Sequence, residues 1–164
     1  QSEVSRSKLN INDPIRDVFK ILGHQLKVHE VEVTLDLDPE LPPIMADHNR
    51  LEQVFVNLIS NAIDAMDEKT VQAKTEDKRK HLTIRSYRQD GRVVAEVVDT
   101  GVGMTKHVRN KLSEPFFTTK KTGKGTGLGT SISYGIVKDY DGHIEVESAL
   151  GKGTSFRLTF PSAG

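Results

Sequence analysis

Three glycine-rich segments interrupt the second half of the chain, and they restrict its fold more than any other feature. They are Asp99–Gly103, Gly123–Gly129 and Gly151–Thr154. The first directly follows the apolar run Val93–Val98, the second leads into a helical pattern that begins at Leu128, and the third separates two short strand patterns. Each segment therefore stands where a regular element begins or ends, and the glycines of the first permit a backbone that closely approaches another group.

Hydrophobic periodicity predicts the elements around these segments. Strands are expected over residues 9–11, 31–37, 82–88, 92–98, 144–148 and 154–160, and helices over 14–28, 48–66, 106–112 and from 128 to a turn at 141–142. The strand at 31–37 alternates apolar and polar residues, which indicates a half-buried strand. Hairpins outnumber parallel crossovers, which favours an α+β fold: a two-layer sandwich with helices on one face of a mixed sheet.

Local signals place the boundaries of these elements. We expect Asp13 to cap the first helix, with Pro14 at its first helical position, and Asp47 to cap the second. The pair Asp90-Gly91 predicts a tight hairpin turn between two strands. The polar stretch 67–80 predicts a loop.

Composition excludes several classes of function. With 164 residues the chain is expected to form one domain, and its net charge of zero gives no basic field for nucleic acid. The absence of cysteine excludes disulfides and thiolate metal sites and fits a cytoplasmic location. No apolar run reaches the ~20 residues of a membrane span, so no direct membrane contact is expected. The six histidines are scattered, which predicts no metal cluster, and the chain does not begin with methionine, which suggests an excised fragment.

The second helix carries a polar stripe at helical spacing, formed by Gln53, Asn57, Asn61 and Asp64. A solvated helix face is the ordinary interpretation of such a stripe. However, asparagine is a poor helix former, and two asparagines one turn apart can direct their oxygens at one ligand. A carboxamide oxygen is a hard neutral donor that suits Mg²⁺.

The glycine segments and one loop add candidate ligand contacts. Asp99, at a strand end, can accept a hydrogen bond from an exocyclic amine such as that of adenine, although an Asx turn explains it equally simply. The alternating glycines of 123–129 before a helix favour phosphate binding by backbone N–H groups. The loop Glu114–Lys121 contains two phenylalanines, which would anchor it to the body of the domain, and lysines, which would reach phosphates. An ordinary loop in which the phenylalanines form a hydrophobic plug is the alternative.

Taken together and in this order, the motifs resemble those of the catalytic domain of histidine kinases, in the superfamily of DNA gyrase, Hsp90 and MutL. The matching segments are Asn57–Ala62, Asp99–Gly103, Pro115–Phe117, Gly125–Gly129 and Gly151–Thr154. The forms Asn-Ala-Ile-Asp-Ala-Met and Phe-Phe-Thr-Thr-Lys are similar to those of nitrogen-regulation and dicarboxylate-sensing kinases. The resemblance implies a Bergerat-type ATP-binding fold.

The resemblance also implies roles for individual residues. Asn61 would ligate Mg²⁺, Asn57 would lie near the phosphates as a catalytic residue with Glu52 as a weaker candidate, and Asp99 would bind the adenine amino group. Thr130 stands where the family commonly has a leucine after the second glycine motif, and we expect this replacement at a helix N-terminus to be tolerated. The remaining nucleotide-binding candidates are Ala65, Gly101, Gly103, Met104, Phe117, Lys120, Lys124, Gly125, Thr126, Gly127, Leu128, Gly129 and Thr154. Either lysine would neutralise phosphate charge.

The activity that the resemblance implies is transfer of the γ-phosphoryl group of ATP, with ADP as product, to a histidine. That histidine would lie on a dimerisation domain absent from this chain, and the next acceptor would be the receiver domain of a response regulator. Residues 1–7 would be a linker remnant, residues 8–164 the catalytic domain with a lid at about 105–124. The isolated domain is expected to be monomeric and the full kinase dimeric.

Two other functions remain open at this point. A module that senses nucleotide without turnover would keep the same motifs. An ATPase of the gyrase or Hsp90 type is disfavoured, because the superfamily's ATP-hydrolysing members carry a glutamate where this chain has Asn57. Neutral imidazole is already nucleophilic, so transfer to histidine needs no such carboxylate.

Overall fold

The computed structural model describes residues 5–72, 79–113 and 128–164 of the chain. Along the chain its elements are β1 (Ser7–Leu9), α1 (Asn12–Val28), β2 (Glu32–Leu37), β3 (Ile44–Ala46), α2 (His48–Gln72), β4 (His81–Gln89), β5 (Arg92–Asp99), α3 (Lys106–Asn110), α4 (Leu128–Asp139), β6 (His143–Ala149) and β7 (Gly153–Pro161). A five-stranded sheet has the spatial order β2-β4-β5-β7-β6, and β1 pairs with β3 separately.

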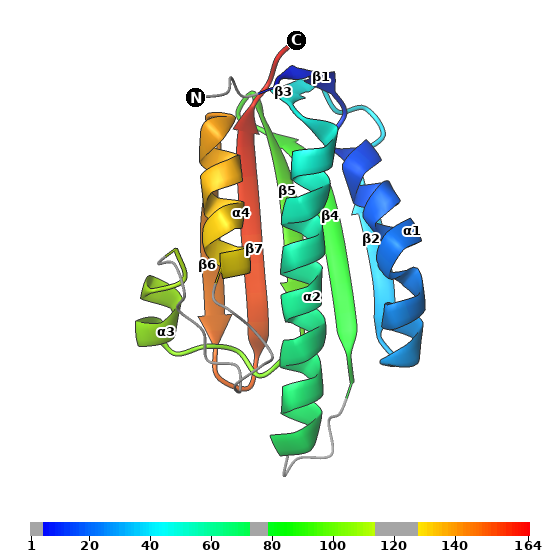
Figure 1. Cartoon of the computed structure of the whole chain (residues 1–164), viewed down its shortest axis with the longest axis vertical. Coiled ribbons are helices and arrows are strands. Elements are labelled where there is room, and N and C mark those ends of the chain that lie inside the picture. Colours follow the sequence, from blue (N-terminus) through cyan, green and yellow to red (C-terminus); the bar gives the residue numbers. More distant parts are fainter. Residues whose placement is uncertain (1–4, 73–78, 114–127) are drawn as a thin grey trace.

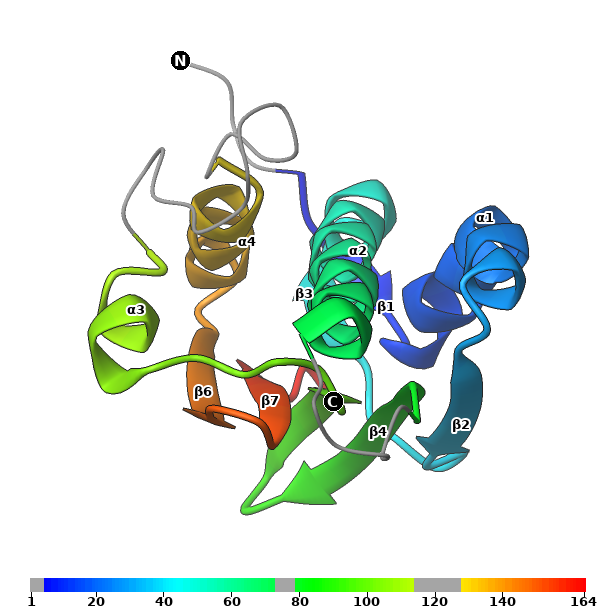
Figure 2. The same cartoon turned by 90° about the horizontal axis from the view of Figure 1, so that it is seen from below.

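The elements form two layers, with α1, α2 and α4 over one face of the five-stranded sheet (Figures 1 and 2). Strand β2 pairs parallel with β4, and all other neighbours in this sheet are antiparallel. The connection between the parallel strands contains α2, in keeping with the long crossover that a parallel pair requires. The predicted α+β sandwich with a mixed sheet is therefore confirmed.

Helix α2 lies between α1 and α4 and supplies much of the core (Figure 2). Its inward face buries Leu51, Val54, Phe55, Leu58, Ile59, Ala62, Ile63 and Met66, which meet the buried residues Leu82, Ile84, Val93, Ala95, Val97, Phe156, Leu158 and Phe160 of the sheet. Gln53 and Asp64 on the opposite side are exposed, as the polar stripe predicts. Burial of each large apolar side chain stabilises the fold by about 1.5–3 kcal/mol, so this interface fixes where α2 lies.

Helix α2 is longer than predicted. It continues beyond Met66 to Gln72, whereas the polar composition of this stretch predicted a loop. The extra turns contain neither glycine nor proline, and Asp67 is held by ion pairs with Lys80 (2.8 Å) and His29 (2.7 Å). The prediction that Asp47 caps the start of α2 is confirmed, because its Oδ2 accepts a hydrogen bond from Arg50 N at 3.0 Å.

The predicted cap of α1 is wrong. The helix begins at Asn12, so Asp13 lies inside its first turn. Asn10 satisfies the start of the helix instead: its Oδ1 accepts from Asn12 N (2.9 Å) and its carbonyl from Asp13 N (3.0 Å). Buried Asn12 then joins the helix to the sheet, because its Oδ1 accepts from Ser86 Oγ at 2.6 Å.

The strands at the periphery also differ from expectation. β1 spans Ser7–Leu9 rather than 9–11 and pairs with the unpredicted strand β3, whose three residues follow two prolines and are too short for a periodic signal. β2 is an edge strand and is largely exposed, with Val33 at 38% and Leu35 at 44% exposure, so its description as half-buried is wrong. α3 is shorter than predicted and ends at Asn110.

The hairpin turn between β4 and β5 is confirmed. Asp90 and Gly91 both have positive φ (52° and 75°), the geometry of the tight turn that Asp-Gly favours. The register of this hairpin pairs Leu82 of β4 with Asp99 of β5. On its other side β5 pairs with β7, and there Asp99 lies opposite Thr154. In the described ranges, no helix combines the length and the apolar character that crossing a bilayer requires.

Candidate functional site

Asp99 ends β5 with a carboxylate that is nearly buried, at 5% exposure. Its Oδ1 accepts a hydrogen bond from Gly101 N at 2.8 Å. Burial raises the pKa of Asp99 to about 6, although the backbone N–H groups of Gly101 and Thr154 and the charge of Lys69 lower it. A further hydrogen-bond donor strongly stabilises the ionised form of a carboxylate that is buried in this way, and a ligand can supply such a donor.

The loop after Asp99 lies directly on α2. Val102 N donates to Ala65 O at 3.0 Å. A Cβ at Gly101 would lie 2.6 Å from the Cβ of Ala65, so only glycine permits this approach. The structure thus brings three predicted site residues, Ala65, Asp99 and Gly101, into one place.

The third glycine segment packs against the first. Gly153 has φ of 93°, and a Cβ there would lie 2.0 Å from Asp99 O. Gly103 has φ of 74°, and its Cβ would lie 2.0 Å from Ala149 O. The glycines therefore let two backbone segments meet beside the Asp99 carboxylate, a contact that the sequence did not predict. Thr154, next to Gly153, is buried at the same point.

Ser148 on β6 connects these two segments and was not predicted as a site residue. Its Oγ accepts from Met104 N at 2.8 Å and donates to Gly153 O at 2.9 Å. It also lies 2.8 Å from Thr154 Oγ1. The one available signal was the predicted pair of strands around Gly151, whose register places Ser148 opposite Thr154.

Asn57 and Asn61 face the start of α4. Asn57 Nδ2 donates to Gly129 O at 3.2 Å and lies 3.4 Å from Ser133 Oγ. Asn61 Nδ2 donates to Thr130 Oγ1 at 3.2 Å. The two asparagines therefore meet the end of the second glycine segment, which the sequence predicts to bind phosphate. Thr130 and buried Ser133 are additional contacts that the motif pattern did not indicate as site residues.

Glu52 lies elsewhere on α2. Its Oε2 is 2.7 Å from Nε2 of His48, and the same nitrogen lies 2.8 Å from Asp17 of α1. Five residues separate Glu52 from Asn57, which corresponds to about 140° around a helix. The structure thus directs Glu52 towards α1 and Asn57 towards α4, and it does not bring these two catalytic candidates together.

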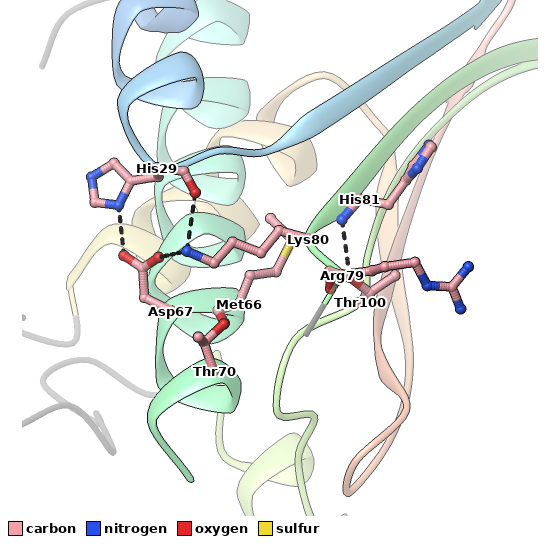
Figure 3. A network of polar contacts seen from close by, with 8 residues as sticks. All are labelled: His29, Met66, Asp67, Thr70, Arg79, Lys80, His81 and Thr100. Atoms are coloured by element: carbon pink, nitrogen blue, oxygen red, sulfur yellow. Dashed lines mark hydrogen bonds and ion pairs between the residues drawn. The ribbon is translucent and has the colours of Figure 1, made fainter. Parts of the chain in front are cut away.

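A polar network joins Thr100, the residue after Asp99, to Arg79 and His81 at the start of β4 (Figure 3). Thr100 Oγ1 accepts from His81 N and donates to Arg79 O, each at 3.0 Å. These bonds fasten the residue after Asp99 to the start of β4. Backbone movement at Asp99 is restricted as a result.

The same view shows how the C-terminal part of α2 is fixed (Figure 3). Asp67 receives Lys80 Nζ at 2.8 Å and His29 Nδ1 at 2.7 Å, and Lys80 also donates to the His29 carbonyl at 3.0 Å. One carboxylate therefore links α2 to the end of α1 and to the residue before β4. Ala65, which contacts the Asp99 loop, lies two residues away on the same helix.

Several predicted site residues lie outside the described ranges: Phe117, Lys120, Lys124, Gly125, Thr126 and Gly127. Leu128 is described as the first residue of α4. The first part of the predicted lid is described: Thr105 caps α3, accepting from Val108 N at 3.2 Å.

Comparison with known families and proteins agrees with this geometry. A family model described as "Histidine kinase-, DNA gyrase B-, and HSP90-like ATPase" matches residues 46–164, more than half of the chain. The chain is 42% identical over 159 residues to sensor kinase CckA of Brucella abortus, covering 93% of this chain and 17% of CckA. It is 38% identical over 152 residues to sporulation kinase E of Bacillus subtilis, covering 93% of this chain and 19% of that kinase. It is 34% identical over 161 residues to the sensory histidine kinase/phosphatase NtrB of Rhodobacter capsulatus, covering 94% of this chain and 43% of NtrB.

Solved structures give the same result. The nucleotide-free catalytic domain of histidine kinase ThkA superposes with a TM-score of 0.79 at 28% identity, covering 96% of each chain. Full-length ShkA in complex with AMPPNP gives 0.80 at 26% identity, over 99% of this chain and 32% of ShkA. ThkA in complex with response regulator protein TrrA superposes with a TM-score of 0.75 at 26% identity, covering 96% of this chain and 42% of that chain. The chain spans about a fifth of the length of the first two curated relatives.

Proposed function

The chain belongs to the family of histidine kinase-, DNA gyrase B- and HSP90-like ATPases, as the ATP-binding catalytic domain of a sensor histidine kinase, and from this we propose its reaction. The domain transfers the γ-phosphoryl group of ATP to a histidine on a dimerisation domain of the same kinase. A response regulator then receives the group. The structure of ThkA with its response regulator supports the class of partner.

The observation that carries this proposal is the buried carboxylate of Asp99 between two glycine segments. Asp99 accepts from Gly101 N, and its burial leaves few water molecules to compete for the carboxylate. An exocyclic amine of adenine is a donor of suitable chemistry for this acceptor. Gly101, Gly103 and Gly153 leave room for backbone but not for additional side chains at this place. The bound AMPPNP of ShkA supports a nucleotide ligand.

The asparagines supply the other end of the proposed site. Asn61 lies one turn beyond Asn57, and both contact the first residues of α4. Asn61 offers a carboxamide oxygen, a hard neutral donor of the kind that Mg²⁺ binds. When bound, Mg²⁺ neutralises phosphate charge and orients the phosphate oxygens. The N-terminus of α4, which begins at Leu128 within the second glycine segment, contributes a favourable dipole for anions.

The proposed reaction rests on positioning rather than on a general base. Asn57 carries no carboxylate and its Nδ2 contacts Gly129 O, so this residue fixes the start of α4 instead of activating water. Phosphoryl transfer needs mainly alignment and charge neutralisation. Direct hydrolysis of ATP is therefore disfavoured, and a nucleophilic imidazole is the acceptor that this site suits.

Two details of the proposal remain predictions. The lid at residues 105–124 extends beyond the described ranges, and the cytoplasmic location rests on composition alone.

The predicted boundary between linker and catalytic domain, at residues 7 and 8, falls inside β1. Ser5 and Arg6 also contact the two residues that follow α4: Tyr140 Oη donates to Ser5 O at 3.0 Å, and Arg6 pairs with Asp141 at 3.2 Å.

The experiment that tests the function has two stages. Calorimetry measures binding of an ATP analogue, with and without Mg²⁺, to the domain and to Asp99→Asn and Asn61→Ala. Transfer of labelled phosphate to a supplied dimerisation domain is then compared with release of free phosphate. Labelled histidine without free phosphate is the expected result. Binding without transfer indicates a nucleotide-sensing module, and steady phosphate release indicates an ATPase, so either contradicts the proposal.

A further inference from the structure

Two carboxylates converge on a single imidazole nitrogen at the surface between α1 and α2. Nε2 of His48 lies 2.8 Å from Asp17 Oδ2 and 2.7 Å from Glu52 Oε2. The side chains of His48 and Asp17 are about one third exposed (36% and 37%), and that of Glu52 is 21% exposed. One ligand atom from each residue lies within 4.8 Å of the others. The histidines are scattered in sequence, so this cluster was not expected from their spacing.

We propose that Asp17, His48 and Glu52 form a binding site for a divalent transition-metal ion of the Zn²⁺ class, separate from the nucleotide site. One imidazole nitrogen and two carboxylate oxygens are ligands that Zn²⁺ accepts, with water completing a four-coordinate shell. Mg²⁺ and Ca²⁺ prefer sites made of oxygen alone. The chain has no cysteine, so an ion that requires thiolate is excluded.

The imidazole nitrogen needs little movement relative to either carboxylate oxygen to hold such an ion, and the two oxygens lie within 4.8 Å of each other. Ligand atoms ~2.0–2.1 Å from a tetrahedral Zn²⁺ lie roughly 3.3 Å from one another. The present separations of 2.7 and 2.8 Å must therefore open by about half an ångström. These side chains are partly exposed, so small rotations of their outer bonds suffice. The two negative charges of the carboxylates then balance the charge of the ion.

Neighbouring groups already orient the three side chains. His48 and Glu52 are four residues apart on α2 and so share one face of the helix. The start of that helix is fixed by Asp47, which accepts from Arg50 N. Lys20 lies 3.3 Å from Oδ1 of Asp17, which leaves Oδ2 directed at the imidazole. Such outer contacts on a carboxylate are typical of metal sites.

The alternative is a network of ion pairs around a protonated imidazole. Other histidines show what that alternative looks like, because each meets a single carboxylate: His29 meets Asp67 at 2.7 Å, His143 meets Glu145 at 3.5 Å and His81 meets Glu32 at 3.6 Å. Among the described residues, the group around His48 is the set of three whose ligand atoms lie within 4.8 Å of one another. His143 therefore provides a control with one carboxylate neighbour, and its side chain is more exposed than that of His48, at 54% against 36%.

The test uses the chain without a polyhistidine tag and without nucleotide. Calorimetry measures binding of Zn²⁺, and visible absorption follows Co²⁺ as a spectroscopic substitute. The variants are His48→Gln and Asp17→Asn, with His143→Gln as control and Asn61→Ala to separate this site from the proposed Mg²⁺ site. Thermal unfolding in EDTA verifies that each variant is folded. A tenfold excess of Mg²⁺ over protein is included as a competitor.

We expect one Zn²⁺ per chain, with affinity that falls about tenfold or more in His48→Gln and in Asp17→Asn. His143→Gln and Asn61→Ala should bind as the unaltered chain does, and Mg²⁺ should not displace the ion. Because the ion joins α1 to α2, Zn²⁺ should raise the Tm of the unaltered chain but not of His48→Gln. Absence of saturable binding, or an equal loss in His143→Gln, would overturn the proposal. Neither result bears on nucleotide binding.

Discussion

Asn61 of α2 donates through Nδ2 to Thr130 Oγ1 of α4, at 3.2 Å. This bond fixes which end of the carboxamide faces α4, so the oxygen of Asn61 points in another direction. In the proposed function that oxygen is the ligand for Mg²⁺. Thr130 therefore acts as a positioning residue for the candidate metal ligand, although the sequence had indicated only a tolerated replacement.

Replacing Thr130 by valine should weaken the response of nucleotide binding to Mg²⁺. Valine keeps the shape of threonine but removes the hydroxyl, so the hydrogen bond from Asn61 Nδ2 to residue 130 is lost. We expect about a tenfold higher Mg²⁺ concentration for half-maximal enhancement, while binding in EDTA stays unchanged. Thr130→Ser retains the hydroxyl and should restore the normal response. A parallel loss of binding in EDTA would point to a general packing effect and contradict this role.

Replacing Asp99 by asparagine should stabilise the nucleotide-free domain. The pKa of Asp99 rises from its ordinary value of 3.8 to about 6, so the folded state holds a proton more tightly than the unfolded state. Ionisation in the folded state therefore lowers the free energy of unfolding as pH rises from about 4 to 6, by up to about 3 kcal/mol. Asparagine is neutral throughout and should remove this loss. Urea unfolding at pH 4 and pH 7.5 measures the difference, which should be larger at pH 7.5.

The same substitution should reduce nucleotide affinity. A hydrogen bond to a charged acceptor is worth about 1.5–3 kcal/mol, which corresponds to a tenfold to hundredfold loss. Affinity of the unaltered domain should also fall below pH 6, because protonated Asp99 is a weaker acceptor for an amine. Calorimetry between pH 5 and pH 8 tests this. A pH-independent affinity would contradict an ionised Asp99 as the acceptor.

Adding a methyl group at Gly153 should disrupt the site. The Cβ of Gly153→Ala would lie 2.0 Å from Asp99 O, and φ of 93° is unfavourable for any side chain. Gly151→Ala is the matched control: its φ of 78° imposes similar strain, but nothing lies within 4 Å of its Cβ. The control should lose about 1–2 kcal/mol of stability. Gly153→Ala should lose clearly more in urea unfolding, together with nucleotide binding, and equal losses would exclude the steric explanation.

The features that the sequence predicts well are those with a local cause. Asp90-Gly91 requires positive φ at two adjacent residues, and the hairpin follows from it. The apolar face of α2 follows from its spacing of apolar residues. Because Asp99 directly follows an apolar run, its position at a strand end was also predictable.

The features that were missed depend on partners far apart in sequence. Asp17 and His48 are separated by 31 residues, and only the packing of α1 on α2 brings them together. β3 has three residues and exists because β1 pairs with it. The exposure of β2 depends on its position at the sheet edge, since its alternating pattern equally fits a half-buried strand. Local periodicity carries no information on such contacts.

Ser148 belongs to this second group, and replacing it by alanine tests whether the site depends on it. The change removes the acceptor for Met104 N and the contacts with Gly153 O and Thr154 Oγ1. Loss of a partner for a part-buried N–H group costs about 1–3 kcal/mol. We expect Ser148→Ala to lower the free energy of unfolding by that amount and to weaken nucleotide binding, since the two glycine segments lose their common contact.

Ser155, on the adjacent strand β7, supplies the control for this experiment. It lies on the outer face of the sheet, where it lines a surface hollow with Arg85 and Glu147. Ser155→Ala should change stability by no more than about 0.5 kcal/mol, with unchanged nucleotide affinity. Urea unfolding and calorimetry on both variants give the comparison. If both serine variants behave alike, Ser148 contributes to the fold only as any strand residue does. If Ser148→Ala alone loses affinity, the β6 strand takes part in positioning Asp99 through Thr154.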